Sequence, residues 1–97
     1  MKVGVCRVTL RIPENQSLKG KRRVIHSLCS RVRNRFDVAI SETDYNQSWK
    51  LATLGIVCVS NSSTHIDQVI HNVVSYIENL REDVELTECE RQIISEF

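Results

Sequence analysis

Residues 50–60, "KLATLGIVCVS", form the most apolar stretch of the chain and decide its fold. If this stretch is extended, Leu54, Ile56 and Cys58 fall on one face and two valines fall on the other. A strand that is apolar on both faces is typical of the interior of a sheet. The stretch therefore predicts a central β-strand, whose neighbours have to come from the segments before and after it.

Three other segments have the pattern of strands. Residues 2–12 alternate, with an apolar set that begins at Gly4 and ends at Ile12 on one face. Residues 36–44 alternate in the same way, and residues 84–94 carry the charges typical of an edge strand. The chain thus contains four predicted strands.

Two amphipathic helices are predicted between these strands. Apolar side chains recur at helical spacing over residues 18–35, and Ser17 is the predicted N-cap. The same spacing predicts a helix over 64–81, with Thr64 and Asp67 as a capping pair. The order β-α-β-β-α-β predicts an α+β fold, the ferredoxin-like plait, in which both helices cover one face of a four-stranded antiparallel sheet.

The length and the hydropathy of the chain indicate its class. Its 97 residues suffice for a single domain, residues 1–97, with one core. No run of 18 apolar residues is present, and the N-terminus resembles a strand more than a signal peptide. We therefore expect a cytoplasmic protein with no membrane partner.

The net charge of +1 conceals a strong polarity along the chain. Residues 1–36 contain ten Lys or Arg and one acid, whereas residues 37–97 contain three Lys or Arg and eleven acids. Such asymmetry indicates a basic face for an anionic partner, or two halves that neutralise each other on folding. The sequence leaves both interpretations open.

The predicted helix 18–35 carries seven cations and no acid. The cations of its first turns lie where the helix dipole disfavours them by roughly 0.3–1 kcal/mol each. Glu78, Glu82 and Asp83, at the end of the second helix, could offset this charge, and so could the phosphates of an external nucleic acid such as RNA. The predicted RNA-binding residues are Lys19, Lys21, Arg22, Arg23, Arg31, Arg33 and Arg35.

The face of the sheet that the helices leave open is the second candidate surface. A ferredoxin-like RNA-binding domain stacks bases on aromatic side chains of its central strands, and the corresponding positions here hold none. Any RNA is therefore expected to bind through its phosphates and shape. The open face would instead suit a homodimer or a protein partner, with an interaction surface formed by Val3, Val5, Arg7, Val57 and Val59.

Catalysis and metal binding find less support. Asp37, Glu42 and Asp44 form an acidic cluster, but no nucleophile or phosphate-binding glycine loop accompanies it. The four cysteines and three histidines lack the spacing of a metal site, and we expect the cysteines to be reduced. Trp49 is predicted to pack at the rim of the core or, paired with Tyr45, to form a contact. We expect a non-enzymatic protein with no cofactor, metal or catalytic residue.

Several motifs resemble the YlxP-like family, a bacterial domain of unknown function. The most specific are Ser17-Leu18-Lys19, Lys21-Arg22-Arg23, Arg33-Asn34-Arg35-Phe36, Glu42, Asp44, Trp49 and Ala52-Thr53-Leu54-Gly55. The resemblance spans the chain, with Asp37 where the family usually has Asn. It implies the ferredoxin-like plait. Genes of this family often lie beside those of translation initiation factor two and ribosome-binding factor A, which implies a role in ribosome maturation or translation. The resemblance thus implies ribosomal RNA or a ribosomal particle as the anionic partner.

Overall fold

The order of helices and strands in the computed structural model, which describes residues 1–44 and 48–97, is the predicted one. The strands are β1 (Lys2–Arg11), β2 (Ala39–Asp44), β3 (Leu51–Ser60) and β4 (Glu85–Ile94), and the helices are α1 (Leu18–Arg35) and α2 (Ser63–Leu80). The predicted contact between Trp49 and Tyr45 lies partly outside the described residues, because these omit Tyr45.

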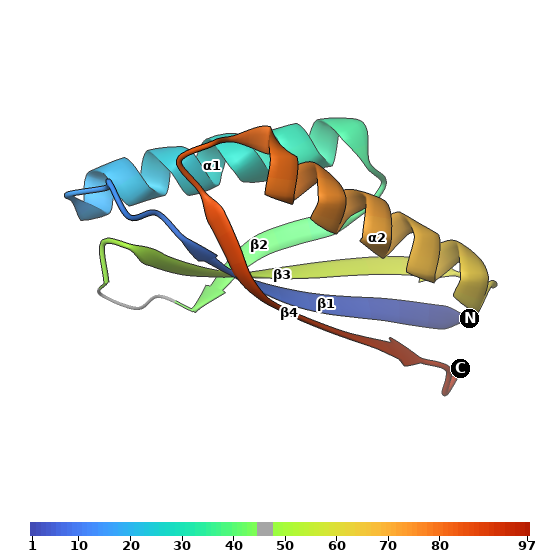
Figure 1. The fold of residues 1–97 in the computed structure, drawn as a ribbon. Helices are drawn as coiled ribbons and strands as arrows, with labels where there is room; N and C mark the ends of the chain where they lie inside the picture. Colours follow the sequence, from blue (N-terminus) through green and yellow to red (C-terminus); the bar gives the residue numbers. More distant parts are fainter. Residues whose placement is uncertain (45–47) are drawn as a thin grey trace.

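The four strands form one antiparallel sheet in the order β2-β3-β1-β4. The apolar strand β3 is central, as predicted, and the charged strand β4 lies at an edge. Both helices lie on the same side of the sheet and run in opposite directions (Figure 1). The fold is therefore the ferredoxin-like α+β plait, with one face of the sheet open.

The core lies between the sheet and the two helices. The predicted inward positions of β1 and β3 are buried, and among them Leu10 and Leu54 are completely inaccessible to solvent. Helix α2 lies very close to β1 at Gly4, where an added Cβ would lie 2.3 Å from Cγ2 of Ile66. Glycine at this position lets α2 pack directly on the sheet.

The ends of the helices differ in detail from the sequence pattern. Helix α2 is capped by Ser62, whose hydroxyl accepts a hydrogen bond from the main-chain N–H of His65 at 3.2 Å. The predicted capping pair of Thr64 and Asp67 is therefore wrong, because the helix begins before Thr64. The N-cap of α1 is Ser17, as predicted. Neither described helix is long and apolar enough to cross a membrane.

Candidate nucleic-acid interface

Helix α1 presents six of its seven cations to solvent. The exposed ones are Lys19, Arg22, Arg23, Arg31, Arg33 and Arg35. Three ion pairs occur among the described residues, and each involves a base outside α1: Arg7 with Glu90, Arg11 with Glu85, and Arg81 with Asp83. Within the described part of the chain, no acidic side chain pairs with an exposed cation of α1.

The acids near the end of α2 do not offset the charge of α1. Asp83 instead accepts two hydrogen bonds from Arg81, at 2.8 Å each, and this contact lowers the pKa of Asp83. Glu78 and Glu82 are exposed and join no ion pair in residues 1–44 and 48–97. The two halves therefore form no ion pair at this point among the described residues, although they do so between β1 and β4, where Arg7 pairs with Glu90 and Arg11 with Glu85.

The relative position of the two helices along their axes explains why these acids do not pair with the cations of α1. The C-terminal end of α1 meets α2 where the rings of Phe36 and Tyr76 lie 5.5 Å apart. Helix α2 ends four residues after Tyr76, about 6 Å farther along its axis. In the opposite helix, Arg23 lies twelve residues before Arg35, about 18 Å away. The N-terminal half of α1 therefore extends past the end of α2 (Figure 1).

Two cations near the end of α1 have structural partners. Nη2 of Arg33 donates to the main-chain oxygen of Ile40 at 2.8 Å, which joins α1 to the edge strand β2. The guanidinium of Arg35 lies 5.0 Å from the centre of the Tyr76 ring, within the range of a cation–π contact. The cations nearer the start of α1 form neither such a hydrogen bond nor a cation–π contact within the described residues. Their charge is therefore available to a partner. They are Lys19, Arg22 and Arg23.

Lys21 is the exception among the predicted RNA-binding residues. It is 3% exposed, and its Nζ donates to the main-chain oxygens of Ser48 at 2.8 Å and Leu51 at 3.1 Å. The prediction that Lys21 contacts RNA is therefore wrong in this structure, because its charge points into the protein. Lys21 instead joins α1 to the segment that leads into β3.

In that segment, the main-chain oxygen of every residue from 48 to 51 accepts a hydrogen bond. Besides the two oxygens that Lys21 binds, the oxygen of Trp49 accepts from Nδ2 of Asn15, and that of Lys50 accepts from the N–H of Ile12 at 2.7 Å. The Asn15 side chain fits there because Gly20 has no Cβ, which would lie 2.3 Å from Oδ1. The main chain of Trp49 is thus held beside the first turn of α1.

The side chain of Trp49 does not pack at the rim of the core. It is 51% exposed, and it is not among the apolar side chains that contact the core. The prediction of a packing role is therefore wrong. The sequence holds no clear signal for this exposure, because polar residues precede Trp49 in "NQSWK" and the apolar strand β3 follows it.

A shallow groove separates α1 from the edge strand β2. Its cavity, about 250 Å³, is lined on the helix side by Arg22, His26 and Arg33, and on the strand side by Ser41 and Glu42. Arg22 thus belongs both to the N-terminal cations of α1 and to this groove. Two arginines of α1, Arg22 and Arg33, thus line this groove together with the acid Glu42.

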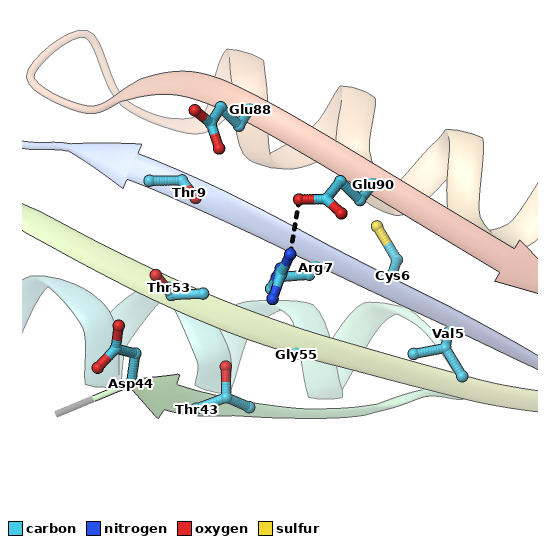
Figure 2. A pocket seen from close by; sticks show the side chains of 10 residues that line it. All are labelled: Val5, Cys6, Arg7, Thr9, Thr43, Asp44, Thr53, Gly55, Glu88 and Glu90. Carbon is cyan, nitrogen blue, oxygen red and sulfur yellow. Dashed lines mark hydrogen bonds and ion pairs between the residues drawn. The ribbon is translucent and has the colours of Figure 1, made fainter.

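The open face of the sheet has a different character. Arg7 lies in its middle and is paired with Glu90 at 2.7 Å (Figure 2). The surrounding cavity, about 530 Å³, is lined by threonines and by Asp44 and Glu88. Of the apolar members of the predicted interaction surface, Val5 lines this cavity, whereas Val57 is 38% exposed and Val59 is 61% exposed. No aromatic residue lies on this face in the described strands.

The acidic cluster predicted around β2 does not form one site. An irregularity in the pairing of β2 with β3 falls between Glu42 and Asp44, so that Glu42 pairs with Leu54 and Asp44 pairs with Thr53. Glu42 lines the groove beside α1, whereas Asp44 lines the cavity on the open face. The carboxylates of Glu42 and Asp44 therefore lie on opposite faces of the sheet and cannot act on one substrate.

The cysteines and histidines form no metal centre among residues 1–44 and 48–97. Three cysteines are buried and Cys89 is exposed, and none is in a disulfide in the described chain. Sγ of Cys6 lies 3.7 Å from Sγ of Cys89. Burial and the hydrogen bond to Cys89 raise the pKa of Cys6 to about 12, so this group is a neutral thiol near pH 7.

Comparison with known proteins shows the family. Residues 3–91 match the model of a family described as "Protein of unknown function (DUF503)". The chain belongs to the DUF503 family. The uncharacterized protein YlxP of Bacillus subtilis (strain 168), a relative, is 36% identical over 66 residues, which cover 68% of this chain and 72% of YlxP. The predicted membership of the YlxP-like family is therefore confirmed.

A solved structure agrees with the fold of this DUF503 protein. The de novo designed protein Foldit4 superposes with a TM-score of 0.52 over 98% of this chain and 99% of its own. Its sequence is 15% identical, so the likeness concerns the fold alone.

Proposed function

We propose that this protein binds structured RNA, as ribosomal RNA or within a ribosomal particle, through the exposed cations of α1. The observation that carries the proposal is that Lys19, Arg22 and Arg23 lack an acidic partner within the described residues. A nucleic-acid backbone favours clustered Lys and Arg because binding releases its condensed counterions. The groove beside β2 extends this basic surface along α1.

The proposed role is binding without catalysis. Glu42 and Asp44 were the best candidates for acid–base chemistry, and their separation by the sheet removes the basis for that role. A role in ribosome maturation or translation, in the cytoplasm, fits the family resemblance and the basic surface. No metal or cofactor is part of the proposal.

Co-sedimentation with purified small ribosomal subunits, at low and moderate salt, tests this function. The variant Arg22→Glu/Arg23→Glu reverses two charges on α1. The control Lys2→Glu/Arg91→Glu makes the same change in net charge at β1 and β4. We expect salt-sensitive binding that the first variant loses and the control keeps. Absence of binding by the wild type, or equal loss in both variants, would contradict the proposal.

A second proposal is self-association through the open face. It is favoured by the exposure of Val57 and Val59. It ranks below RNA binding because the middle of this face is polar, with Arg7 already paired with Glu90. Light scattering over a range of concentrations tests it: a dimer mass that Val59→Lys reduces to that of a monomer would support it.

A further inference from the structure

Trp49 combines an exposed ring with a rigid main chain. Half of its side chain is accessible to solvent, although burial of an indole is strongly favoured by the hydrophobic effect. The carbonyls of residues 48–51 all accept hydrogen bonds, from Ile12, Asn15 and Lys21. A loop whose only task is to connect β2 to β3 does not need a buried ammonium group to hold it.

The same contacts place the main chain of Trp49 beside the basic N-terminal end of α1. Asn15 donates to the oxygen of Trp49 and also to that of Ser17, the N-cap of α1. The side chains of Lys19, in the first turn, and of Lys50, next to Trp49, are exposed. An exposed aromatic residue and lysines that join no ion pair among the described residues thus lie on neighbouring segments.

We propose that Trp49 stacks on an unpaired base of RNA while Lys19 and Lys50 contact the flanking phosphates. Stacking on an aromatic ring together with a basic track is how proteins hold single-stranded nucleic acid. The bases of a continuous duplex already stack on each other and cannot take this position. The inference rests on the proposed function and adds to it that the RNA is recognised at a loop, bulge or single-stranded end.

The chain itself supplies the reporter for a test, because Trp49 is its only tryptophan. Three probes separate stacking from charge: a uridine 12-mer, a 12-base-pair RNA duplex and inorganic polyphosphate, each titrated at fixed low salt. We expect the uridine 12-mer to quench the fluorescence of Trp49 and polyphosphate to bind without quenching it. Quenching by polyphosphate equal to that by the 12-mer would overturn the inference.

Substitutions at Trp49 give the second measurement. We expect Trp49→Leu to bind the uridine 12-mer roughly 5- to 150-fold more weakly, the range that stacking of one base supplies. Trp49→Phe should recover part of the loss, and Phe97→Leu, an exposed aromatic outside the site, should have no effect. Polyphosphate affinity should be the same for all of these proteins.

The outcomes distinguish the inference from the proposed function. If Trp49→Leu binds the 12-mer as the wild type does, stacking is refuted while RNA binding through α1 stands. If the wild type binds neither the 12-mer nor the duplex, both are refuted. If Trp49→Leu also loses polyphosphate, the substitution has damaged the basic surface and stacking is not the cause. An acidic peptide that binds in a Trp49-dependent way while the 12-mer does not would point to a protein partner and refute the inference.

Discussion

Nζ of Lys21 lies 2.8 Å from the main-chain oxygen of Ser48, and this contact joins the first turns of α1 to the segment that carries Trp49. Lys21 is buried, whereas its neighbours Arg22 and Arg23 are exposed. Lys21 therefore organises this surface, whereas Arg22 and Arg23 are available for a partner.

Replacement of Lys21 should destabilise the protein more than replacement of an exposed lysine. We expect Lys21→Met to lower the free energy of unfolding by about 1.5–3 kcal/mol, because it removes the hydrogen bonds of a buried charged group to two main-chain carbonyls. The matched control Lys19→Met, at an exposed position of the same helix, should change it by less than about 0.5 kcal/mol. Urea unfolding measures both. Equal effects of the two substitutions would show that the contact with Ser48 is not stabilising.

Asn15 should act as a positioning residue for Trp49. Asn15→Ala removes the hydrogen bond to the oxygen of Trp49 while leaving the cations of α1 in place. We expect faster amide exchange over residues 48–51 and weaker binding of the uridine 12-mer, with unchanged affinity for polyphosphate. Glu14→Ala, one residue earlier and exposed, is the control. Unchanged exchange in Asn15→Ala would contradict this role.

Gly4 should be sensitive to the smallest possible side chain. In Gly4→Ala the new methyl group meets Ile66 of α2 at 2.3 Å, so the helix or the strand has to shift. We expect a loss of about 1–3 kcal/mol in the free energy of unfolding. The loss should be smaller when Gly4→Ala is made in an Ile66→Ala background. Additive effects of the two substitutions would indicate that Ile66 is not the cause.

The stability of the protein should fall in alkaline solution. An unfolded Cys6 thiol ionises near its ordinary pKa of 9.0, whereas burial and Cys89 raise its pKa to about 12 in the folded state. The stabilisation from a neutral Cys6 is therefore complete below pH 9 and is lost as the pH rises toward 12. The slope approaches about 1.4 kcal/mol per pH unit.

Urea unfolding between pH 8 and pH 11 measures this loss. Cys6→Ala should give a flatter dependence on pH than the wild type. Cys89→Ser should keep most of the dependence, because burial is the larger cause of the raised pKa. Identical pH profiles for the wild type and Cys6→Ala would show that another group is responsible.

Periodicity predicted the architecture because burial follows the geometry of each element. The alternation that places Leu10 and Leu54 inward determined β1 and β3, and both side chains are fully buried. The start of α2 was less predictable, because Ser62 and Thr64 are both good N-caps and the packing of the helix decides between them. The irregularity between Glu42 and Asp44 has no signal in the strand period, so the sequence placed both carboxylates in one cluster.

The candidate site was only partly predictable for a similar reason. A helical wheel gives the direction of a side chain but not what the rest of the chain places above it. The segment 48–51 lies over Lys21, and this contact depends on a pairing between residues far apart in the sequence. For the same reason the exposure of Trp49 followed from the structure alone.

The salt dependence of RNA binding tests the central claim most directly. The measurement is the affinity for the uridine 12-mer at several salt concentrations, for the wild type, Arg22→Glu/Arg23→Glu and the control Lys2→Glu/Arg91→Glu. Each phosphate contact contributes about 0.7 to the slope of log affinity against log salt for a single strand, so the α1 variant should lose about 1.4. The control should keep the wild-type slope. Equal slopes for all three proteins would contradict RNA binding through α1.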